Sequence, residues 1–165
     1  MEDKEYKMSW SKRVVVITIS SILIIISTLI PVAYFSIKDG KGSLLIFIFL
    51  FTIALLITTY GYSPKKIVVN KNSIRIIKGI GEIIIPKNTI HSYRKLEKKE
   101  MAGTIRRAAS GGLFGFFGKF SNPQIGKFNM YATRMYNLVL IKLKDGEQIV
   151  LSPDNLTEFF KDNVY

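Results

Sequence analysis

The sequence predicts a membrane-spanning α-helical hairpin followed by a mainly β domain. In this α+β unit the sheet would curl into a partly open barrel, capped by a C-terminal helix. Three observations indicate this class. Two long apolar runs lie between residues 14 and 62. Short runs rich in β-branched residues, separated by turn residues, follow between residues 67 and 151. The last segment spaces its apolar residues as one face of a helix does.

The first apolar run, Val14 to Phe35, has 22 residues without a charge, and the second, Leu44 to Tyr60, has 17 and extends to Tyr62. A helix of about 20 apolar residues crosses a bilayer core of roughly 30 Å. A buried pair of core helices would need a larger domain, because both runs are apolar on every face. The first run also exceeds the apolar region of a cleavable signal peptide. We therefore predict a retained two-helix transmembrane hairpin over residues 14–62.

Basic residues flank the hairpin on one side, and they set its predicted orientation. Those before the first run and after the second are Lys4, Lys7, Lys12, Arg13, Lys65, Lys66, Lys71, Arg75 and Lys78. The connecting turn, Ser36–Ser43, has only Lys38 and Lys41, partly offset by Asp39. Because cytoplasmic segments carry the excess of Lys and Arg, we predict a multi-pass protein of the cell membrane with both termini cytoplasmic. Residues 1–13 are then a cytoplasmic N-terminal tail, and residues 63–165 form the cytoplasmic domain.

The segment after the hairpin is basic and contains no cysteine. From Ser63 onward, 18 Lys and Arg stand against 8 Asp and Glu, a net charge of +10. Such a charge suits an acidic lipid surface, nucleic acid or an acidic protein, although it also occurs in domains with no such partner. Without cysteine, a disulfide or a thiolate metal site is excluded.

Six or seven antiparallel strands are predicted after the hairpin. Ser63-Pro64 ends the second helix, because proline disfavours helical backbone in the residue before it. Runs of apolar and β-branched residues between turn residues then indicate strands at Ile67–Val69, Ile74–Ile77, Glu82–Ile85, Thr89–Leu96, Gly126–Thr133, Asn137–Lys144 and Glu147–Leu151. The clearest turns are Asn70–Ser73 and Asp145-Gly146, whose residues tolerate positive φ. Lys95–Met101 is a charged connection.

A short helix is predicted at the C-terminus. Ser152 is suited to cap its N-terminus, Pro153 to its first position, and Asp154 to the positive end of its dipole. The apolar residues that then share one face are Leu156, Phe159, Phe160 and Val164. We expect this face to plug one end of the barrel, with Phe159 and Phe160 in the core.

Four short motifs stand out along the domain: Ile125-Gly126-Lys127-Phe128, Tyr131-Ala132-Thr133, Asn137-Leu138-Val139-Leu140 and Ser152-Pro153-Asp154. With the two preceding spans, they resemble bacterial membrane proteins that carry a pleckstrin-homology (PH)-like domain. The resemblance covers nearly the whole chain. It implies a PH-like partly open barrel and a membrane tether, but no activity and no catalytic residue. The phosphoinositide-binding basic motif of eukaryotic members is not recognisable here, so their ligand is not implied.

The segment from Gly103 to Gly126 departs from the strand pattern. Between residues 111 and 120 it holds four glycines and four phenylalanines. Because glycine weakens both helices and strands, we predict an extended loop or irregular excursion on the membrane-proximal side of the domain. Neither Gly118-Lys119 nor Gly126-Lys127 completes a phosphate-binding loop, since phenylalanine follows each lysine.

Two interpretations of this segment remain open. In one, its phenylalanines pack onto the domain or the hairpin, and the glycines allow close approach of the backbone. In the other, it is an apolar tip rimmed by cations that contacts the lipid interface or a groove in a partner. The candidate membrane or partner contacts are Arg106, Arg107, Leu113, Phe114, Phe116, Phe117, Lys119 and Phe120.

Nothing in the sequence favours an enzyme. His91 is the lone histidine and has no nucleophile beside it, and Asp154 with Glu158 fits a solvated helix face. No cluster has the spacing of metal ligands, and no nucleic-acid motif accompanies the basic charge. We therefore predict no catalytic residue, cofactor or metal, and we do not expect nucleic acid as a partner.

The predicted function is a membrane-anchored PH-like binding module at the cytoplasmic face. It would recruit a partner protein or anionic lipid without catalysis. The alternative is a structural or accessory subunit of a membrane protein complex, with the hairpin as its interface. A module would keep its binding when the hairpin is removed, whereas a subunit would lose it.

Overall fold

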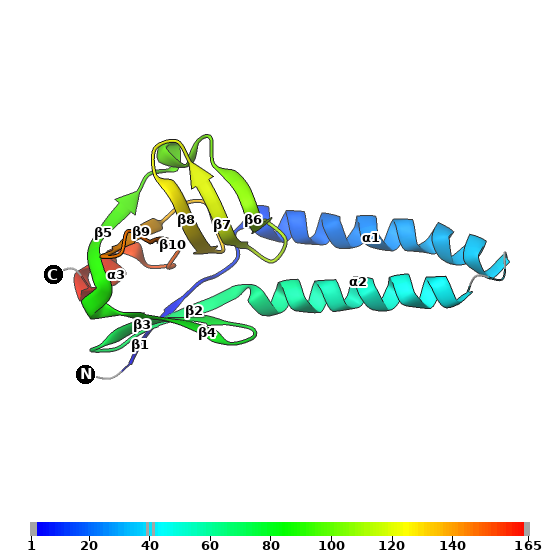
Figure 1. Cartoon of the computed structure of the whole chain (residues 1–165), viewed down its shortest axis with the longest axis horizontal. Helices are drawn as coiled ribbons and strands as arrows, with labels where there is room; N and C mark the ends of the chain where they lie inside the picture. The colour runs from blue at the N-terminus through cyan, green and yellow to red at the C-terminus, as the bar shows by residue number, and fades with distance from the viewer. Residues whose placement is uncertain (1–2, 39, 41, 164–165) are drawn as a thin grey trace.

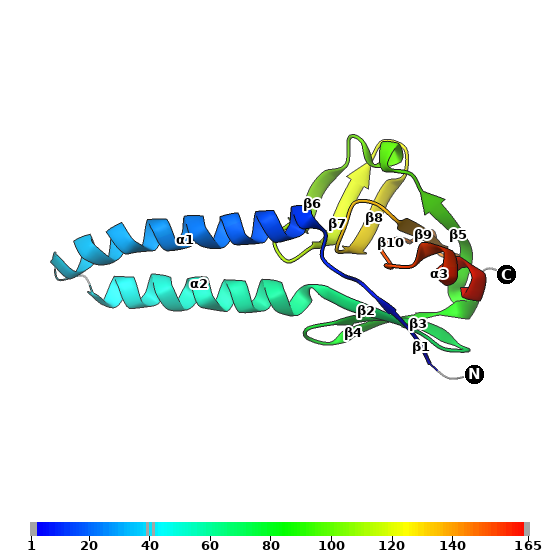
Figure 2. The ribbon, with the colours of Figure 1, turned by 180° about the vertical axis from the view of Figure 1, so that it is seen from behind.

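The computed structural model describes residues 3–38, 40 and 42–163. Two N-terminal helices project side by side from one end of a β-sheet domain, and a C-terminal helix lies at the end away from them (Figure 1). Seen from behind, the N-terminal segment crosses the domain before it enters the first helix (Figure 2). Two helices followed by an open-sheet domain with a C-terminal helix are the arrangement that the sequence predicted.

The two helices, α1 (Lys12–Lys38) and α2 (Gly42–Tyr62), extend beyond the predicted apolar runs. Both are long and apolar enough to cross a membrane. Several of their hydroxyl groups bond back to helix carbonyls, as in Thr28 Oγ1, which donates to Ile24 O over 3.0 Å. Their buried residues lie only at the end next to the domain: Val14, Thr18 and Gly61. The predicted outer turn includes residues 39 and 41, which lie outside the described residues.

Ten strands in the described part of the chain form two open sheets. The first sheet has the order β1-β2-β3-β4, with β1 Lys4–Lys7, β2 Pro64–Val69, β3 Ser73–Lys78 and β4 Glu82–Pro86. The second has the order β5-β9-β10-β8-β7-β6, with β5 Ile90–Leu96, β6 Ile105–Gly111, β7 Phe116–Asn122, β8 Gly126–Ala132, β9 Leu138–Leu143 and β10 Gln148–Leu151. Two 3-10 turns, η1 (Lys87–Thr89) and η2 (Lys98–Met101), follow β4 and β5.

Two features of these sheets were not predicted. The N-terminal segment contributes a strand, because β1 pairs antiparallel with β2 and places Tyr6 opposite Ile67. The prediction that every strand is antiparallel is wrong at one place, where β10 runs parallel to β8 with Val150 opposite Met130. The cause is the strand order. β9 lies between β5 and β10 and is antiparallel to both, so β10 is the strand that lies next to β8. In that position β10 runs in the same direction as β8.

Apolar side chains gather in two cores. The first core is Tyr6, Met8, Ile67, Val69, Ile74, Ile76, Ile85, Val139, Ile141, Ile149, Leu151, Leu156 and Phe159. The second core is Val14, Leu96, Met101, Phe116, Phe120, Ile125, Phe128, Met130, Ala132, Leu138, Leu140 and Val150. Strand β9 sends Val139 and Ile141 to the first core and Leu138 and Leu140 to the second. Because side chains alternate across a strand, the two cores occupy opposite faces of the same sheet.

The C-terminal helix α3 (Leu156–Asn163) begins later than predicted. Asn155, and not Ser152, caps it, since Asn155 Oδ1 accepts a hydrogen bond from Glu158 N over 3.1 Å. The side chain of Phe159 is fully buried in the first core, as predicted, whereas Phe160 packs against that core only half-buried. Val164 lies outside the described residues.

Asp154, which was expected at the positive end of the α3 dipole, instead fastens the segment before α1. The Asp154 carboxylate pairs with Arg134 and accepts a hydrogen bond from Ser9 N over 2.8 Å. Arg134 Nη2 donates to Ser9 O over 2.8 Å, and Thr133 Oγ1 donates to the same oxygen over 2.9 Å. The segments on both sides of the hairpin are therefore bound to the domain, one by this cluster and the other through β2.

The glycine- and phenylalanine-rich segment is a β-hairpin, and the prediction of an irregular excursion is wrong. Strands β6 and β7 pair from Ile105–Ser121 to Gly111–Phe116, with an irregularity at Arg107. Gly118 has φ +111°, and a side chain there would overlap the carbonyl oxygen of Ala108 in β6. Glycine weakens an ordinary strand, but here it allows the positive φ and the close approach of two backbones.

Candidate functional site

The tip between β6 and β7 is fixed against the bases of both helices. In α1, Thr18 Oγ1 accepts a hydrogen bond from Phe114 N over 3.0 Å. After α2, Ser63 Oγ donates to Phe114 O over 2.6 Å. Gly112 packs on α1 so closely that a Cβ there would lie 2.6 Å from Ile17 Cδ1. The hairpin of helices and the hairpin of strands therefore hold each other in position.

An aromatic cluster surrounds Phe114 at this junction. The ring centroid of Phe114 lies 5.9 Å from that of Trp10 and 5.3 Å from that of Tyr60. Lys65 places its ammonium 3.5 Å from the centroid of Tyr60 and 5.6 Å from that of Trp10. Such cation–π contacts stabilise a charge beside an apolar surface. This side of the α2 base is thus occupied by the protein's own side chains.

The predicted contact residues divide into three groups. Phe114, Phe116 and Phe120 are buried, with exposed fractions of 9%, 6% and 4%, so their rings contact the protein itself. Leu113 and Phe117 are half-buried at the tip and in β7. The cations are exposed but separate: Arg106 lines one hollow, while Arg107 and Lys119 line another.

The first of these hollows, which we call the basal hollow, lies between the last turn of α2, the end of β3 and strands β6–β8. Its volume is about 600 Å³, and the residues that line it are Thr58, Thr59, Tyr62, Lys78, Arg106, Ala108, Ala109, Ser110, Gly111, Leu113, Phe117, Gly118 and Tyr131. Two of these residues are cations, and among the described lining residues none is acidic. The hollow therefore combines positive charge, hydroxyl groups and an apolar wall.

Both cations of the basal hollow are positioned by neighbours. Lys78 holds its ammonium 4.9 Å from the ring centroid of Tyr62, at the end of α2. The Arg106 guanidinium lies over Gly111, where a Cβ would stand 2.6 Å from Arg106 Nη1. Any residue larger than glycine at position 111 would displace that guanidinium, because the overlap involves its charged end. The absence of a side chain at Gly111 thus makes room for the charge.

The wall of the basal hollow is formed by Phe117 and Tyr131, which are opposite each other on β7 and β8. Burial raises the pKa of the Tyr131 hydroxyl, with a smaller contribution from the Glu147 carboxylate. The phenol is therefore neutral at physiological pH and can donate a hydrogen bond. An anionic group bound beside it would meet two cations and one or more hydroxyl donors.

Sequence reasoning found only part of this arrangement. It named Arg106, Leu113 and Phe117 as contact residues, whereas Lys78 and Tyr62 were named only as flanks of the helical hairpin and the paired threonines of α2 were not named. The signal was present, because Tyr62 ends an apolar run and Lys78 belongs to the basic flank that follows it. The sequence alone does not show that the end of β3 and strand β6 lie next to the same end of α2.

The basal hollow has the features of a binding site. Across the described residues, no group of three His, Cys, Asp or Glu side chains could hold a metal ion. His91 is exposed on β5, away from the basal hollow. Asp154 does not form a free acidic face with Glu158, because it pairs with Arg134. The chemistry available at the hollow is attraction of a negative group and burial of an apolar one.

Comparison with known proteins finds one family. The model of the bacterial PH domain family matches residues 65–164, from β2 through α3. No curated protein and no solved structure matches the chain. The matched range begins just after α2, so the two helices lie outside it.

Proposed function

Since the chain belongs to the bacterial PH domain family, a generally non-catalytic family, we propose that it is a membrane-anchored binding module with no catalysis of its own. In this proposal α1 and α2 span the cell membrane, both termini are cytoplasmic, and the module occupies residues 63–165 together with β1. Its ligand is an anionic lipid headgroup at the basal hollow. A partner protein at the same face is the other ligand that the basic charge suits.

One observation supports the lipid most directly: the basal hollow opens beside the last turn of α2. Tyr62 ends that helix, and aromatic rings of this kind favour the headgroup level of a membrane. Lys78 and Arg106 would then lie where lipid phosphates are, each adding roughly 1 kcal/mol of attraction to an anionic surface. Leu113 and Phe117 offer an apolar contact for the part of the lipid below its phosphate.

Native mass spectrometry of the full chain, released from nanodiscs of mixed phosphatidylcholine and phosphatidylglycerol, tests the proposal. We expect the wild-type protein to retain phosphatidylglycerol in preference to phosphatidylcholine. Lys78→Gln with Arg106→Gln should remove that preference. Lys71→Gln with Lys95→Gln is the matched control, because both lysines are exposed and line none of the hollows described. Equal retention by all three proteins would reject the basal hollow as a lipid site.

Orientation is tested separately, with a reporter fused after Tyr165. The positive flanks of the hairpin predict that this reporter is cytoplasmic. A reporter on the outer side would reject the orientation and, with it, contact between the module and cytoplasmic lipid. It would leave the described fold unaffected.

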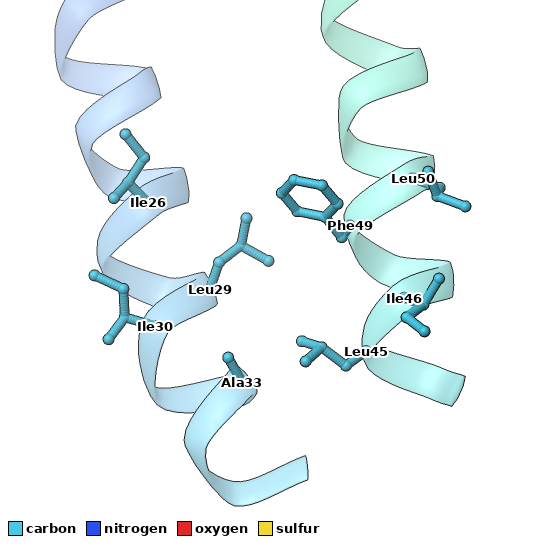
Figure 3. Close-up of a pocket in the computed structure, with 8 residues that line it drawn as sticks. All are labelled: Ile26, Leu29, Ile30, Ala33, Leu45, Ile46, Phe49 and Leu50. Atoms are coloured by element: carbon cyan, nitrogen blue, oxygen red, sulfur yellow. The ribbon is translucent and has the colours of Figure 1, made fainter. Parts of the chain in front are cut away.

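A second candidate function, a structural or accessory subunit that uses the hairpin as its interface, is favoured by one feature. A wholly apolar groove of about 420 Å³ runs between the outer halves of α1 and α2, lined by Ile26, Leu29, Ile30, Ala33, Leu45, Ile46, Phe49 and Leu50 (Figure 3). The hydrophobic effect does not hold helices together in lipid, so such a groove accepts a partner helix only by close packing.

The two candidates differ in what the outer hairpin must do. Replacing residues 19–57 with an unrelated two-span hairpin leaves the contacts of Thr18, Tyr60 and Tyr62 in place. A binding module should retain phosphatidylglycerol after this exchange. A subunit held by its hairpin should lose the proteins that co-purify with the wild-type chain.

A further inference from the structure

A second basic surface lies beyond the basal hollow, on the same face of strands β6–β8. The face is defined by register: Phe117 is opposite Tyr131, Lys119 opposite Asn129, and Ser121 opposite Lys127. Side chains directly opposite each other on antiparallel strands share a face, as do alternate residues of one strand. Lys119 and Lys127 are therefore diagonal neighbours on the face that also carries the wall of the basal hollow.

This surface is a groove rather than a flat patch. One hollow of about 540 Å³ is lined by Arg107, Lys119, Lys127, Asn129, Glu147 and Gln148, among others. Another, of about 490 Å³, is lined by Ser121 and Pro123 and shares Arg107 and Lys127 with the first. Two of the cations line both hollows, so the hollows adjoin each other. We call the two hollows together the sheet groove.

Three cations of the sheet groove are not paired with carboxylates of the described residues. Elsewhere on the described surface, several cations are paired with carboxylates, as in Arg75–Glu82 and Arg94–Glu100. Arg107, Lys119 and Lys127 form no ion pair within the described residues. Like charges on neighbouring strands repel each other, so this arrangement costs stability until an anion approaches.

The distance of the sheet groove from the helices argues against a lipid as its ligand. In both ribbon views β6 is the strand of the six-stranded sheet nearest the helices, and β8, β10 and β9 lie successively farther away (Figures 1 and 2). The groove extends from β6 to Glu147 and Gln148, at the turn between β9 and β10. A headgroup held in the bilayer could meet only the near end of it. The far end is open to partners that arrive through water.

We propose that the sheet groove binds an acidic, extended segment of a partner protein. Length favours a chain over a single small anion, because the cations are spread over three strands and two adjoining hollows. The sheet groove is also positive along one part and negative at another. The Glu147 carboxylate, which accepts a hydrogen bond from Asn129 Nδ2, lines one part and would repel an acidic chain there. The acidic residues of the segment would therefore lie along Arg107, Lys119 and Lys127.

The test uses the full chain in nanodiscs of phosphatidylcholine alone, so that anionic lipid does not compete. A fluorescein-labelled decapeptide of glutamate is the probe, and fluorescence anisotropy at low and moderate salt is the measurement. Lys119→Gln with Lys127→Gln should weaken binding about tenfold. Lys71→Gln with Lys95→Gln is the matched control, because Lys71 follows β2 in the other sheet, Lys95 is on β5 at the opposite edge of this sheet, and neither lines the groove; it should have little effect.

A variant that should tighten peptide binding tests whether loss of folding explains the weaker binding of the lysine variants. Glu147→Gln removes the one acidic side chain among the described residues that line the groove, and it should tighten binding about two- to threefold. Equal weakening by the two lysine pairs would show a diffuse charge effect and overturn the proposal, as would no binding at low salt. Displacement of the peptide by inorganic phosphate at equal charge concentration would also overturn it, because a small-anion site would then suffice. The retention of phosphatidylglycerol should be unchanged in Lys119→Gln with Lys127→Gln, so failure here is distinguishable from failure at the basal hollow.

Discussion

In the first core most side chains come from strands with consecutive apolar and β-branched residues, whereas the second core depends on a hairpin of glycine and phenylalanine. The first is closed by α3, through Leu156 and Phe159. The second is closed by Val14 at the start of α1 and by the half-buried Trp10 just before that helix. The PH-like sheet thus has one face completed by its own helix and the other by the base of the helical hairpin. The folding of the second core and the placement of the helices are therefore coupled.

The largest effect should follow from truncating the first core. Phe159→Ala should cost about 3–5 kcal/mol, because Phe159 is fully buried and truncation leaves a cavity. Phe160→Ala, one position along the same helix, should cost only about 1–2 kcal/mol, because Phe160 is half-buried. Urea unfolding of the full chain in detergent, followed by the fluorescence of Trp10, gives both values. Similar costs for the two variants would mean that α3 does not dock as described.

The fluorescence of Trp10 also shows whether the two cores unfold independently. It contacts the second core, while Phe159 is in the first. Strands β9 and β10 contribute to both cores, so we expect the Phe159→Ala change to lower the midpoint seen by Trp10. An unchanged midpoint, beside a lowered one from near-ultraviolet circular dichroism, would show that the second core unfolds separately.

The difference between the cores also explains what the sequence could predict. Strands of the first core, such as Ile74–Ile77, have β-branched runs bounded by turn residues, and this signal is local. The hairpin at residues 105–122 carries the opposite local signal, since its glycines disfavour strands. Its stability comes from contacts distant in sequence, such as that of Phe114 with Thr18. The parallel pairing of β10 with β8 is likewise decided by the whole sheet and by no single segment.

The candidate site was predicted in part for the same reason. Arg106, Leu113 and Phe117 were found because their composition is unusual in one continuous stretch. Lys78 was not singled out, because only the fold brings the end of β3 to the helix base and to β6. The buried Phe116 and Phe120 were assigned to the same surface, but alternation along β7 turns them to the second core.

A substitution in the β6–β7 hairpin, which contributes to the second core, should have the next largest effect on the free energy of unfolding. Gly118→Ala should cost about 2–3 kcal/mol, because φ is +111° there and the new Cβ would overlap the Ala108 carbonyl. Gly81→Ala is the matched control: its φ is +70°, and nothing lies within 4 Å of a Cβ. It should cost about 1–2 kcal/mol from the backbone alone. The same unfolding measurement applies. Equal costs would mean that β6 and β7 are farther apart at Gly118 than described.

The contact between the strand hairpin and α1 should be weaker again. Thr18→Val removes the oxygen that accepts from Phe114 N and leaves that amide buried without a partner, which costs about 1–2 kcal/mol. Thr28→Val is the matched control, because the Thr28 hydroxyl bonds only to carbonyls of its own helix. Hydrogen exchange should accelerate at Phe114 in Thr18→Val and remain unchanged in Thr28→Val. Unchanged exchange in both would show that the tip is held by its aromatic contacts alone.

The smallest expected effect concerns the edge of the first core, where β1 is attached. Tyr6 is buried and packs edge-to-face on Phe159, with centroids 5.2 Å apart, while its hydroxyl donates to the Asp162 carboxylate. Lys4 adds an ion pair to the same carboxylate at 2.6 Å. Hydrogen bonds from Lys4 and then Tyr6 are the main causes that lower the pKa of Asp162 below its ordinary value. The attachment of β1 thus has a packed part and a charged part.

These two parts respond differently to acid. A carboxyl group whose pKa is lowered by folding stabilises the folded state above its ordinary pKa of 3.8, and this contribution is lost as pH falls through the lowered value. The group is open to water, so the change should be small and should shrink with salt. The packing of the Tyr6 ring does not change with pH in this range. We therefore expect β1 to remain paired with β2 in acid. Carboxyl chemical shifts measured by NMR should place the Asp162 titration below 3.8, and Asp162→Asn should remove the pH dependence from that window alone. Titration of Asp162 at its ordinary value, or release of β1 as it protonates, would mean that charge rather than packing attaches the strand to the first core.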